Sequence, residues 1–273
     1  QFLKEFPKVK NVNLFELGPG NGLLSMDIYH YLKSKNINVN DLTLLEKSEY
    51  FREKISEKSE VKVNFIKNIY DYKIDNGDVV FIYSNEFFDA IGSKQFIYNN
   101  GNFNEIKISK NNDEYLLIKD STIISRELLN YYSSYNFKDN DILEHSNLIL
   151  NILSDIQKLE CKKYFFTTTD YGYTKLPFKS TLRLLSNHKK LNLFDKFENV
   201  DYSFGVNFEL MNSFFLKNNP SIIYQKDLIL NNLPSEYLKS SDKNIKEMID
   251  LISGKKFGGM GTSFLNLSFK KNE

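Results

Sequence analysis

The sequence predicts an α/β fold: a parallel sheet flanked by helices, with an antiparallel and helical insertion after the fourth strand. Three observations support this prediction. In the first third of the chain, short apolar runs alternate with stretches of helical periodicity. The middle third alternates apolar and polar residues between turn formers. The last third returns to apolar strands and amphipathic helices, which is typical of an interrupted α/β core.

The first part of the chain alternates strands and helices. Apolar runs rich in β-branched and aromatic residues predict strands at Val12–Leu17, Leu42–Leu45, Val61–Ile66 and Asp78–Tyr83. Apolar spacing predicts a helix over residues 23–32, and Ser48 is a candidate N-cap for a helix that ends near Ile55. Strands that alternate with helices pair in parallel, so this part predicts a parallel sheet covered by helices.

The later elements define the domain boundaries. Alternation predicts an antiparallel meander of Lys94–Tyr98, Phe103–Ile108 and Tyr115–Ile118. Helices are expected over residues 121–133, 143–159, Asn207–Leu216 and Asp242–Ile252, and strands over Lys163–Thr168, Ser221–Tyr224 and Ser263–Phe269. We therefore divide the chain into residues 1–92 and 161–273, which form the core, and an insertion at residues 93–160.

Composition excludes several classes of protein. The net charge is +1, from 36 basic and 35 acidic residues among 273, so no global field attracts nucleic acid or an anionic membrane. Cys161 is the only cysteine, which excludes a disulfide framework. No apolar run approaches the ~20 residues of a membrane span. Because the first residue is Gln1, we expect a fragment or a processed form that could have lost a targeting segment.

Three glycines follow the first predicted strand at alternate positions. The stretch LFELGPGNGLL contains Gly18, Gly20 and Gly22, in a chain with only 12 glycines. A dinucleotide fingerprint requires Gly or Ala where Leu23 stands, and the Lys and Ser/Thr of a P-loop are missing. The G-x-G-x-G spacing behind an acid is instead the pattern of class I S-adenosylmethionine (SAM) methyltransferases. There the backbone passes under the methionyl-ribosyl group, where a Cβ would collide.

Three polar residues complete the predicted cofactor site. Glu16, just before the glycines, is placed to hold the cationic amino group of the methionine part. Glu46, at the end of the second strand, can accept two hydrogen bonds from ribose hydroxyls, a feature that dinucleotide folds share. Asn68, after the third strand, is a candidate adenine contact. SAM is therefore the predicted cofactor, and a purely structural strand-to-helix turn is the alternative explanation of the glycines.

Further motifs follow in a fixed order along the chain. They are ELGPGNG at Glu16–Gly22, NEFFDAIG at Asn85–Gly92, DYGY at Asp170–Tyr173, then Thr181, Leu182 and His188, DYSFGVNF at Asp201–Phe208, and Met260–Gly261. In these motifs, from about residue 1 to residue 270, the chain resembles the MidA family of class I SAM methyltransferases. That family includes the mitochondrial complex I assembly factor that methylates an arginine of a complex I subunit. The NEFFDA and DYGY pair is the specific part of the resemblance.

The chain departs from the family pattern in a few places. The departures are Asn21, Ile91–Gly92, Thr167–Thr169 and Asn207. The family also normally carries an N-terminal segment that helps to cover the cofactor, and the sequence given does not contain it.

The resemblance implies a protein methyltransferase directed at arginine, with a respiratory complex I subunit as its substrate, in the bacterial cytoplasm or the mitochondrial matrix. Asn85, Glu86 and Asp89 follow the fourth strand, where class I enzymes place the reacting methyl group. Paired hydrogen bonds from a guanidinium to such carboxylates would fix its plane. Asp170, after the fifth strand, is a candidate on the substrate side. The alternative for these acids is that they cap helices.

Two rival functions stay open at this point. One is a small-molecule methyltransferase, and the other is a non-catalytic assembly factor or binding module that keeps the fold. A nicotinamide dehydrogenase is the least favoured reading because of Leu23. No Ser/His/Asp triad or metal-ligand spacing is visible, so no metal is predicted. His188 is the one histidine that matches the family, and the oligomeric state is not predicted.

Overall fold

The chain divides into two compact units. The computed structural model describes residues 1–74, 79–111, 114–120, 126–187, 189–195, 200–253 and 260–272, so Asp78 and His188 lie outside the described residues. The first unit contains Gln1–Phe87, Ile152–Tyr171 and Met211–Glu273, and the second contains Phe88–Asn151 and Gly172–Leu210. The second unit therefore takes residues from two stretches, whereas the sequence placed only residues 93–160 outside the core.

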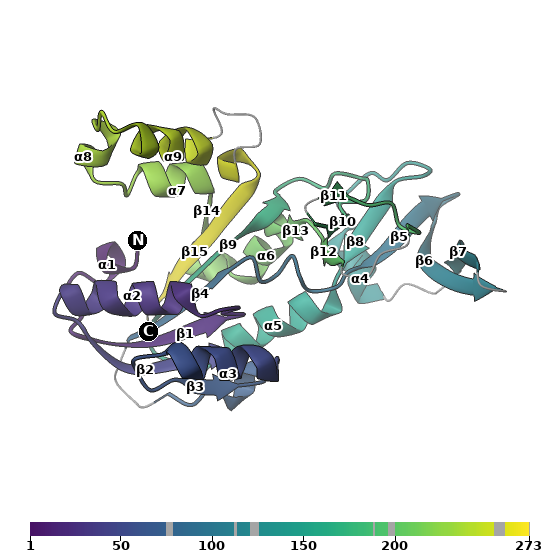
Figure 1. Ribbon diagram of the computed structural model, residues 1–273. Helices are drawn as coiled ribbons and strands as arrows, with labels where there is room; N and C mark the ends of the chain where they lie inside the picture. The colour runs from purple at the N-terminus through teal and green to yellow at the C-terminus, as the bar shows by residue number, and fades with distance from the viewer. Residues whose placement is uncertain are drawn as a thin grey trace. The chain divides into compact units, whose positions relative to one another are not determined.

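A mostly parallel sheet forms the centre of the first unit (Figure 1). Its strands are β1 (Asn11–Leu17), β2 (Asn38–Leu45), β3 (Asn64–Ile66), β4 (Val79–Asn85), β9 (Tyr164–Tyr173), β14 (Ser221–Tyr224) and β15 (Phe264–Lys271). They lie in the order β14-β15-β9-β4-β1-β2-β3, and β15 is antiparallel to both of its neighbours. An eighth strand, β13 (Val206–Asn207), pairs in parallel with the end of β9. The predicted α/β class is confirmed, although β3 is shorter and β9 is longer than predicted.

Helices of the first unit pack against its sheet or against one another. They are α1 (Phe2–Glu5), α2 (Leu23–Ser34), α3 (Glu49–Lys58), α7 (Gln225–Leu230), α8 (Ser235–Leu238) and α9 (Lys243–Ser253), with 3₁₀ turns η1 (Ile69–Asp71), η2 (Leu216–Asn218) and η3 (Met260–Thr262). Leu14 and Leu44 of the sheet pack with Leu32 of α2 and Ile55 of α3 in one core. Ser48 caps α3 as predicted, because its hydroxyl accepts a hydrogen bond from the Phe51 amide at 3.4 Å.

The second unit is built on a smaller antiparallel sheet. Its strands are β5 (Lys94–Asn99), β6 (Asn102–Asn111), β7 (Glu114–Asp120) and β8 (Ile142–His145), in the order β7-β6-β5-β8. The remaining elements are α4 (Arg126–Tyr131), α5 (Asn147–Lys158), which runs on into the first unit, β10 (Arg183–Ser186), β11 (Lys189–Lys190), β12 (Asp201–Ser203), β13 (Val206–Asn207) and α6 (Phe208–Phe214). The predicted meander is confirmed.

Two helix predictions need correction. The helix expected over residues 143–159 is wrong at its start, because Ile142–His145 pair with β5 as a strand and α5 begins only at Asn147. Of the helix expected over residues 121–133, the described part forms a helix at Arg126–Tyr131, and residues 121–125 lie outside the described residues. The short apolar run of β8 is compatible with either structure, and pairing with β5 selects the strand.

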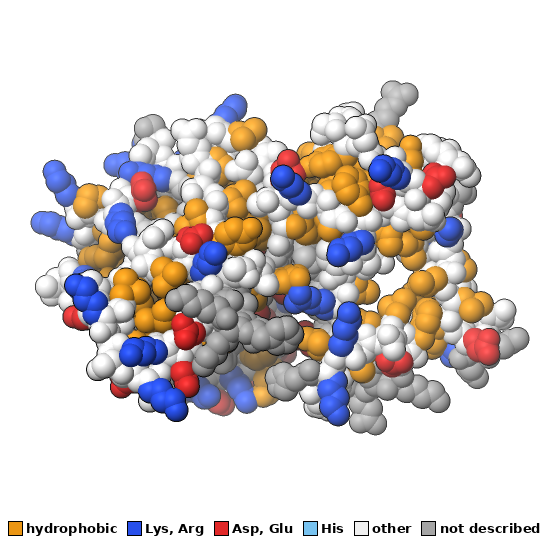
Figure 2. Space-filling view, turned by 90° about the horizontal axis from the view of Figure 1, so that it is seen from above, with side chains coloured by type: hydrophobic (Ala, Val, Ile, Leu, Met, Phe, Trp, Pro, Cys, Tyr) orange, Lys and Arg blue, Asp and Glu red, His pale blue; other side chains and the backbone are white. Residues whose placement is uncertain are grey.

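The surface agrees with a nearly neutral chain. On the face that Figure 2 shows, Lys and Arg side chains are spread among Asp and Glu side chains and apolar groups. In the described segments, no helix combines the length and the apolar character needed to cross a membrane.

Candidate functional site

The glycine turn joins β1 to α2 at the carboxyl edge of the parallel sheet. Gly18, Gly20 and Gly22 have φ values of +66°, +54° and +78°. Residues with a side chain rarely adopt this left-handed region, whereas glycine adopts it without a steric cost. The unusual backbone that the spacing predicts is therefore present at all three glycines.

The three glycines are needed for different reasons. A Cβ on Gly18 would lie 2.5 Å from Cδ2 of Phe87, and one on Gly22 would lie 3.0 Å from Cγ1 of Ile55. The protein's own packing thus requires these two glycines. A Cβ on Gly20 would meet no described atom within 4 Å. Gly20 is therefore the glycine whose open side can face a bound molecule.

Beneath the turn, Glu16 is buried in a polar cluster that links three elements. Its carboxylate accepts a hydrogen bond from Ser25 on α2, and the Ser25 and Tyr83 hydroxyls lie 2.9 Å apart. Burial raises the pKa of Glu16 to about 7, against the opposing effect of the Ser25 hydrogen bond. Burial and the nearby Glu16 carboxylate also raise the pKa of Tyr83. The sequence analysis missed Ser25 and Tyr83, because only the fold brings them to Glu16.

Glu46 and Asn68 stand at the same edge of the sheet as the glycines. The Gly18 amide donates to the Leu45 carbonyl at the end of β2 at 3.1 Å, and the Glu46 amide donates to the Ile66 carbonyl of β3 at 3.1 Å. The Glu46 carboxylate accepts a hydrogen bond from the Ser48 amide at 2.7 Å. Asn68, after β3, donates to the Asp71 carboxylate at 3.2 Å. Three loops that follow neighbouring parallel strands thus meet where α/β sheets bind their ligands.

The carboxyl ends of β4 and β9 hold the stretch Asn85–Phe87 in place. Asn85 ends β4, and the exposed Glu86 that follows has φ +49°, an uncommon value for a residue with a side chain. The Glu86 amide donates to the Thr169 carbonyl at 2.9 Å, and the Phe87 amide donates to the Asp170 carboxylate at 3.1 Å. The sheet therefore fixes the backbone that presents the Glu86 side chain.

Asp170 has a different role from the helix cap considered in the sequence analysis. That alternative is wrong for Asp170, because β9 continues through Tyr173 and no helix begins at this point. Asp170 is fully buried, and its carboxylate accepts hydrogen bonds from the Phe87 and Tyr171 amides. The structure thus brings Asn85, Glu86 and Asp170 together in the first unit, whereas Asp89 belongs to the second, where its carbonyl accepts from the Phe204 amide at 3.0 Å.

A buried asparagine that the sequence analysis did not select lies beside this region. Asn266 of β15 donates to Thr167 Oγ1 at 2.8 Å, to the Thr168 carbonyl at 3.1 Å and to Thr169 Oγ1 at 3.0 Å. The threonines that depart from the family pattern thus pair with a polar residue on the neighbouring strand. A polar residue inside the predicted last strand was the available sequence signal.

Among the residues that the structure describes, no group of three or more His, Cys, Asp or Glu side chains could hold a metal ion. The candidate binding site at this sheet edge therefore consists of the glycine turn and the polar residues around it.

The fold and the turn between β1 and α2 define a class I, Rossmann-like SAM-dependent methyltransferase. More specifically, residues 1–222 match the family described as "Putative S-adenosyl-L-methionine-dependent methyltransferase", and the chain belongs to that family. The cofactor of the family is SAM.

Two solved structures from Burkholderia thailandensis share the fold. The first is an uncharacterised protein that is 14% identical, with a TM-score of 0.80 over 98% of this chain and 76% of its own. The second, a member of the same superfamily crystallised with S-adenosyl-homocysteine bound, is 14% identical, with a TM-score of 0.76 over 98% of this chain and 73% of its own. A comparison with curated protein sequences found no match.

Proposed function

We propose that this protein transfers the methyl group of SAM to an arginine side chain of a protein substrate, and that the substrate is a subunit of respiratory complex I. The observation that supports binding of the methyl donor is the open space beside Gly20. Gly20 lies at the same edge of the sheet as Glu46 and Asn68. The arginine and complex I parts rest on the resemblance to the MidA family in the NEFFDA and DYGY motifs.

In this proposal, side chains from three loops hold the cofactor. When bound, SAM supplies an electrophilic methyl group on a sulfonium. Glu46 accepts hydrogen bonds from the ribose hydroxyls, and Asn68 contacts the adenine. Glu16 faces the amino group of the methionine part, and a positive charge there favours the ionised form of a carboxyl whose pKa burial raises to about 7. Gly18, Gly20 and Gly22 shape the turn beneath the methionyl-ribosyl group.

The acceptor guanidinium is held by the residues after β4. A guanidinium stays cationic because its pKa lies above ~12, so its nitrogens are poor nucleophiles. The exposed Glu86 carboxylate can accept paired N–H bonds that fix the guanidinium plane and draw its charge away from the attacking nitrogen. Asn85 is the further substrate contact that we propose in the first unit, and the same proposal for Asp89 rests on the NEFFDA motif alone. Asp170 is a positioning residue, because its buried carboxylate binds the amide of Phe87, next to Glu86.

One observation favours a second candidate, a small neutral acceptor. A cavity of about 500 Å³ in the first unit is bounded by Ser84 and Asn85 at the end of β4, by Leu24 and Tyr31 of α2, and by Asn266. None of the described residues that line this cavity is acidic, so it does not match a cationic guanidinium. Its lining combines apolar side chains with Lys4 and with several amide and hydroxyl groups, so it would suit a partly apolar molecule that carries hydrogen-bonding groups.

Calorimetric titration with S-adenosyl-homocysteine tests the methyl-donor part. We expect micromolar binding that Gly20→Val abolishes, because the new side chain enters the space left for the cofactor. Gly101→Val is the matched control, since Gly101 also has a positive φ (+82°) and open space around its Cβ position but lies in the β5–β6 turn. Binding of NAD by the parent chain, or equal loss of binding in both variants, would contradict the assignment.

Methyl transfer from labelled SAM to purified complex I subunits, with mass spectrometry of the products, tests the acceptor. We expect methylarginine, and a loss of product in Glu86→Gln while binding of S-adenosyl-homocysteine is retained. Product on a small molecule alone would favour the second candidate. Cofactor binding with no product on either acceptor would favour a non-catalytic assembly factor.

A further inference from the structure

A chain of hydrogen bonds joins three buried side chains beneath the glycine turn. Glu16 of β1 lies opposite Tyr83 of β4 in the parallel pairing, and Ser25 belongs to the first turn of α2. Each of the three residues is at most 2% exposed. Buried polar side chains are kept where they have hydrogen-bond partners, so the two hydroxyl groups and the carboxyl group depend on one another.

The donor in each of these hydrogen bonds can be assigned from the number of available protons. The Ser25 hydroxyl donates to the Glu16 carboxylate. A serine hydroxyl has only one proton, so the Tyr83 hydroxyl is the donor in the 2.9 Å contact between the two hydroxyl oxygens. The hydrogen bonds therefore run from Tyr83 through Ser25 to Glu16. Successive donors that point toward a carboxylate favour its ionised form.

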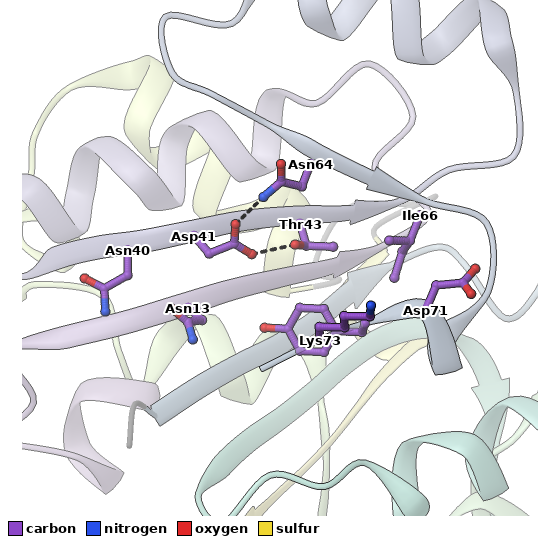
Figure 3. A pocket seen from close by; sticks show the side chains of 9 residues that line it. Asn13, Asn40, Asp41, Thr43, Asn64, Ile66, Asp71 and Lys73 are labelled. Carbon is purple, nitrogen blue, oxygen red and sulfur yellow. Dashed lines mark hydrogen bonds between the residues drawn. The ribbon is translucent and has the colours of Figure 1, made fainter. Parts of the chain in front are cut away.

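The sheet itself supplies no further polar partner on this face. Across the sheet, Glu16 lies opposite Leu44 of β2, which packs in the apolar core with α2 and α3. Alternate residues of a strand point to opposite faces, so Asp41 of β2 lies on the other face. There its carboxylate accepts hydrogen bonds from Thr43 and Asn64 (Figure 3). Asp41 therefore does not belong to the chain around Glu16.

The charged groups on the adjoining elements do not neutralise the Glu16 carboxylate. Asp27 of α2 and Glu86 after β4 are exposed, Glu46 after β2 is half-buried, and all three are acids. Tyr83 is the titratable residue that faces Glu16. Burial and the Glu16 carboxylate raise the pKa of Tyr83, so its hydroxyl stays a neutral donor.

A cation beside the glycine turn would complete this arrangement. In the proposed function, on which this inference rests, the ammonium group of the cofactor's methionine part lies near Glu16. We propose that Ser25 and Tyr83 are positioning residues that hold the Glu16 carboxylate beneath this ammonium group, and that cofactor binding transfers the proton of a neutral Glu16 to the solvent. Because the surroundings of Glu16 exclude water, the attraction between the two charges is strong without direct contact.

The proposal makes cofactor affinity depend on pH. Burial raises the pKa of Glu16 to about 7, so below this pH the free protein carries mainly the neutral carboxyl group. Binding of the cationic cofactor then has to release the proton. The affinity should therefore fall as the pH falls below about 7.

Calorimetric titration of the full chain with S-adenosyl-homocysteine at pH 5.5, 6.5 and 7.5, in buffers of different ionisation enthalpy, tests the proposal. We expect release of nearly one proton per bound ligand at pH 5.5 and of progressively less toward pH 7.5. At pH 5.5, Ser25→Ala should bind about tenfold and Tyr83→Phe about threefold more weakly than the parent chain. Both differences should shrink toward pH 7.5, because the loss of a donor raises the pKa of Glu16 further.

A second ligand and a matched variant separate positioning from a merely structural role. The ligand is 5′-methylthioadenosine, which lacks the amino-acid part of the cofactor. Its affinity should be independent of pH and equal in the parent chain, Ser25→Ala and Tyr83→Phe. The control variant is Tyr164→Phe, because Tyr164 is also a buried tyrosine of this sheet, 1% exposed, but lies at the start of β9, away from the glycine turn. It should bind both ligands like the parent chain.

Several outcomes would overturn the proposal. Binding of S-adenosyl-homocysteine with the same affinity from pH 5.5 to 7.5, or without proton release, would refute the coupling and leave the cofactor site intact. Equal weakening of both ligands in Tyr83→Phe would mean that Tyr83 only supports the fold. Unchanged affinity in both variants would show that Glu16 acts without Ser25 and Tyr83. No binding of S-adenosyl-homocysteine by the parent chain at any of these pH values would refute the proposed cofactor site and this proposal with it.

Discussion

Replacing Glu16 with glutamine tests whether the buried carboxyl group beneath the glycine turn lowers the free energy of unfolding when it is ionised. Glutamine keeps the shape of the side chain and an oxygen that accepts the Ser25 hydrogen bond, but it removes the titratable charge. Glu16 is 2% exposed and lies beside Ser25 and Tyr83. The difference in the free energy of unfolding between the variant and the parent chain therefore measures the cost of burying a carboxylate at this position.

The pKa of Glu16 determines the size and sign of the effect. Folding raises it from 4.5 to about 7, so between these pH values the folded chain binds more protons than the unfolded chain. The contribution of Glu16 to stability is then fully present below pH 4.5 and is lost as the pH rises through about 7. The loss amounts to about 3 kcal/mol, at ~1.4 kcal/mol for each pKa unit.

Urea denaturation of the parent chain and Glu16→Gln at pH 5, 6, 7 and 8 measures this difference. We expect similar free energies of unfolding at pH 5, and a variant that is more stable than the parent by about 3 kcal/mol at pH 8. Titration with S-adenosyl-homocysteine at pH 8 should show weaker binding by the variant, because the carboxylate that we propose to face the cofactor's amino group is gone.

A constant difference between the two proteins from pH 5 to pH 8 would refute the reasoning, because a titrating buried carboxyl must produce a pH-dependent difference. A variant that is less stable than the parent at pH 8 would also refute it, since the charge would then stabilise the fold.

Three further substitutions probe the packing around the site. Gly18→Ala should lower the melting temperature, at a cost of about 1–3 kcal/mol, because its Cβ would lie 2.5 Å from Cδ2 of Phe87. Glu86→Gly should stabilise the chain by about 0.5–1 kcal/mol, because glycine relieves the strain at φ +49°, while an assay of methyl transfer should show a loss. Asn266→Ala should cost about 2 kcal/mol in urea denaturation, because three acceptors on β9 lose their donor.

Each of these predictions has a clear contrary result. An unchanged melting temperature in Gly18→Ala would mean that the Phe87 ring moves aside freely. Destabilisation by Glu86→Gly would show that the side chain, and not the backbone, holds this turn. A stable Asn266→Ala would mean that the threonines find other donors.

Local patterns predicted the seven strands of the first unit's main sheet and the three strands of the meander, but they missed β8 and the short strands β10, β11, β12 and β13. The run ILEHSNLIL, residues 142–150, is compatible with a strand or a helix, and only antiparallel pairing with β5 assigns its first part to β8. DYGY looked like a segment after β9, yet pairing with β15 up to Tyr171 and with β13 at Gly172–Tyr173 keeps it in the strand. These decisions depend on partners that are distant in the chain.

The candidate site was likewise predicted only in part from the sequence. The spacing of the glycines, the acid before them and the acid after β2 identified the sheet edge and the class of cofactor, because each of these signals lies within a few residues of a strand end. The sequence could not show that Gly18 makes room for Phe87, that Asp170 binds a backbone amide, or that Glu16 meets Tyr83.

The sequence by itself determined the α/β class, the main strands of the parallel sheet and of the meander, and the methyl-donor turn, because backbone freedom, hydrophobic period and capping are local properties. Only the tertiary structure decided the raised pKa of Glu16 and the role of Asp170. Burial and hydrogen-bond partnership depend on which residues from distant strands become neighbours, and that information exists only once the sheet has formed.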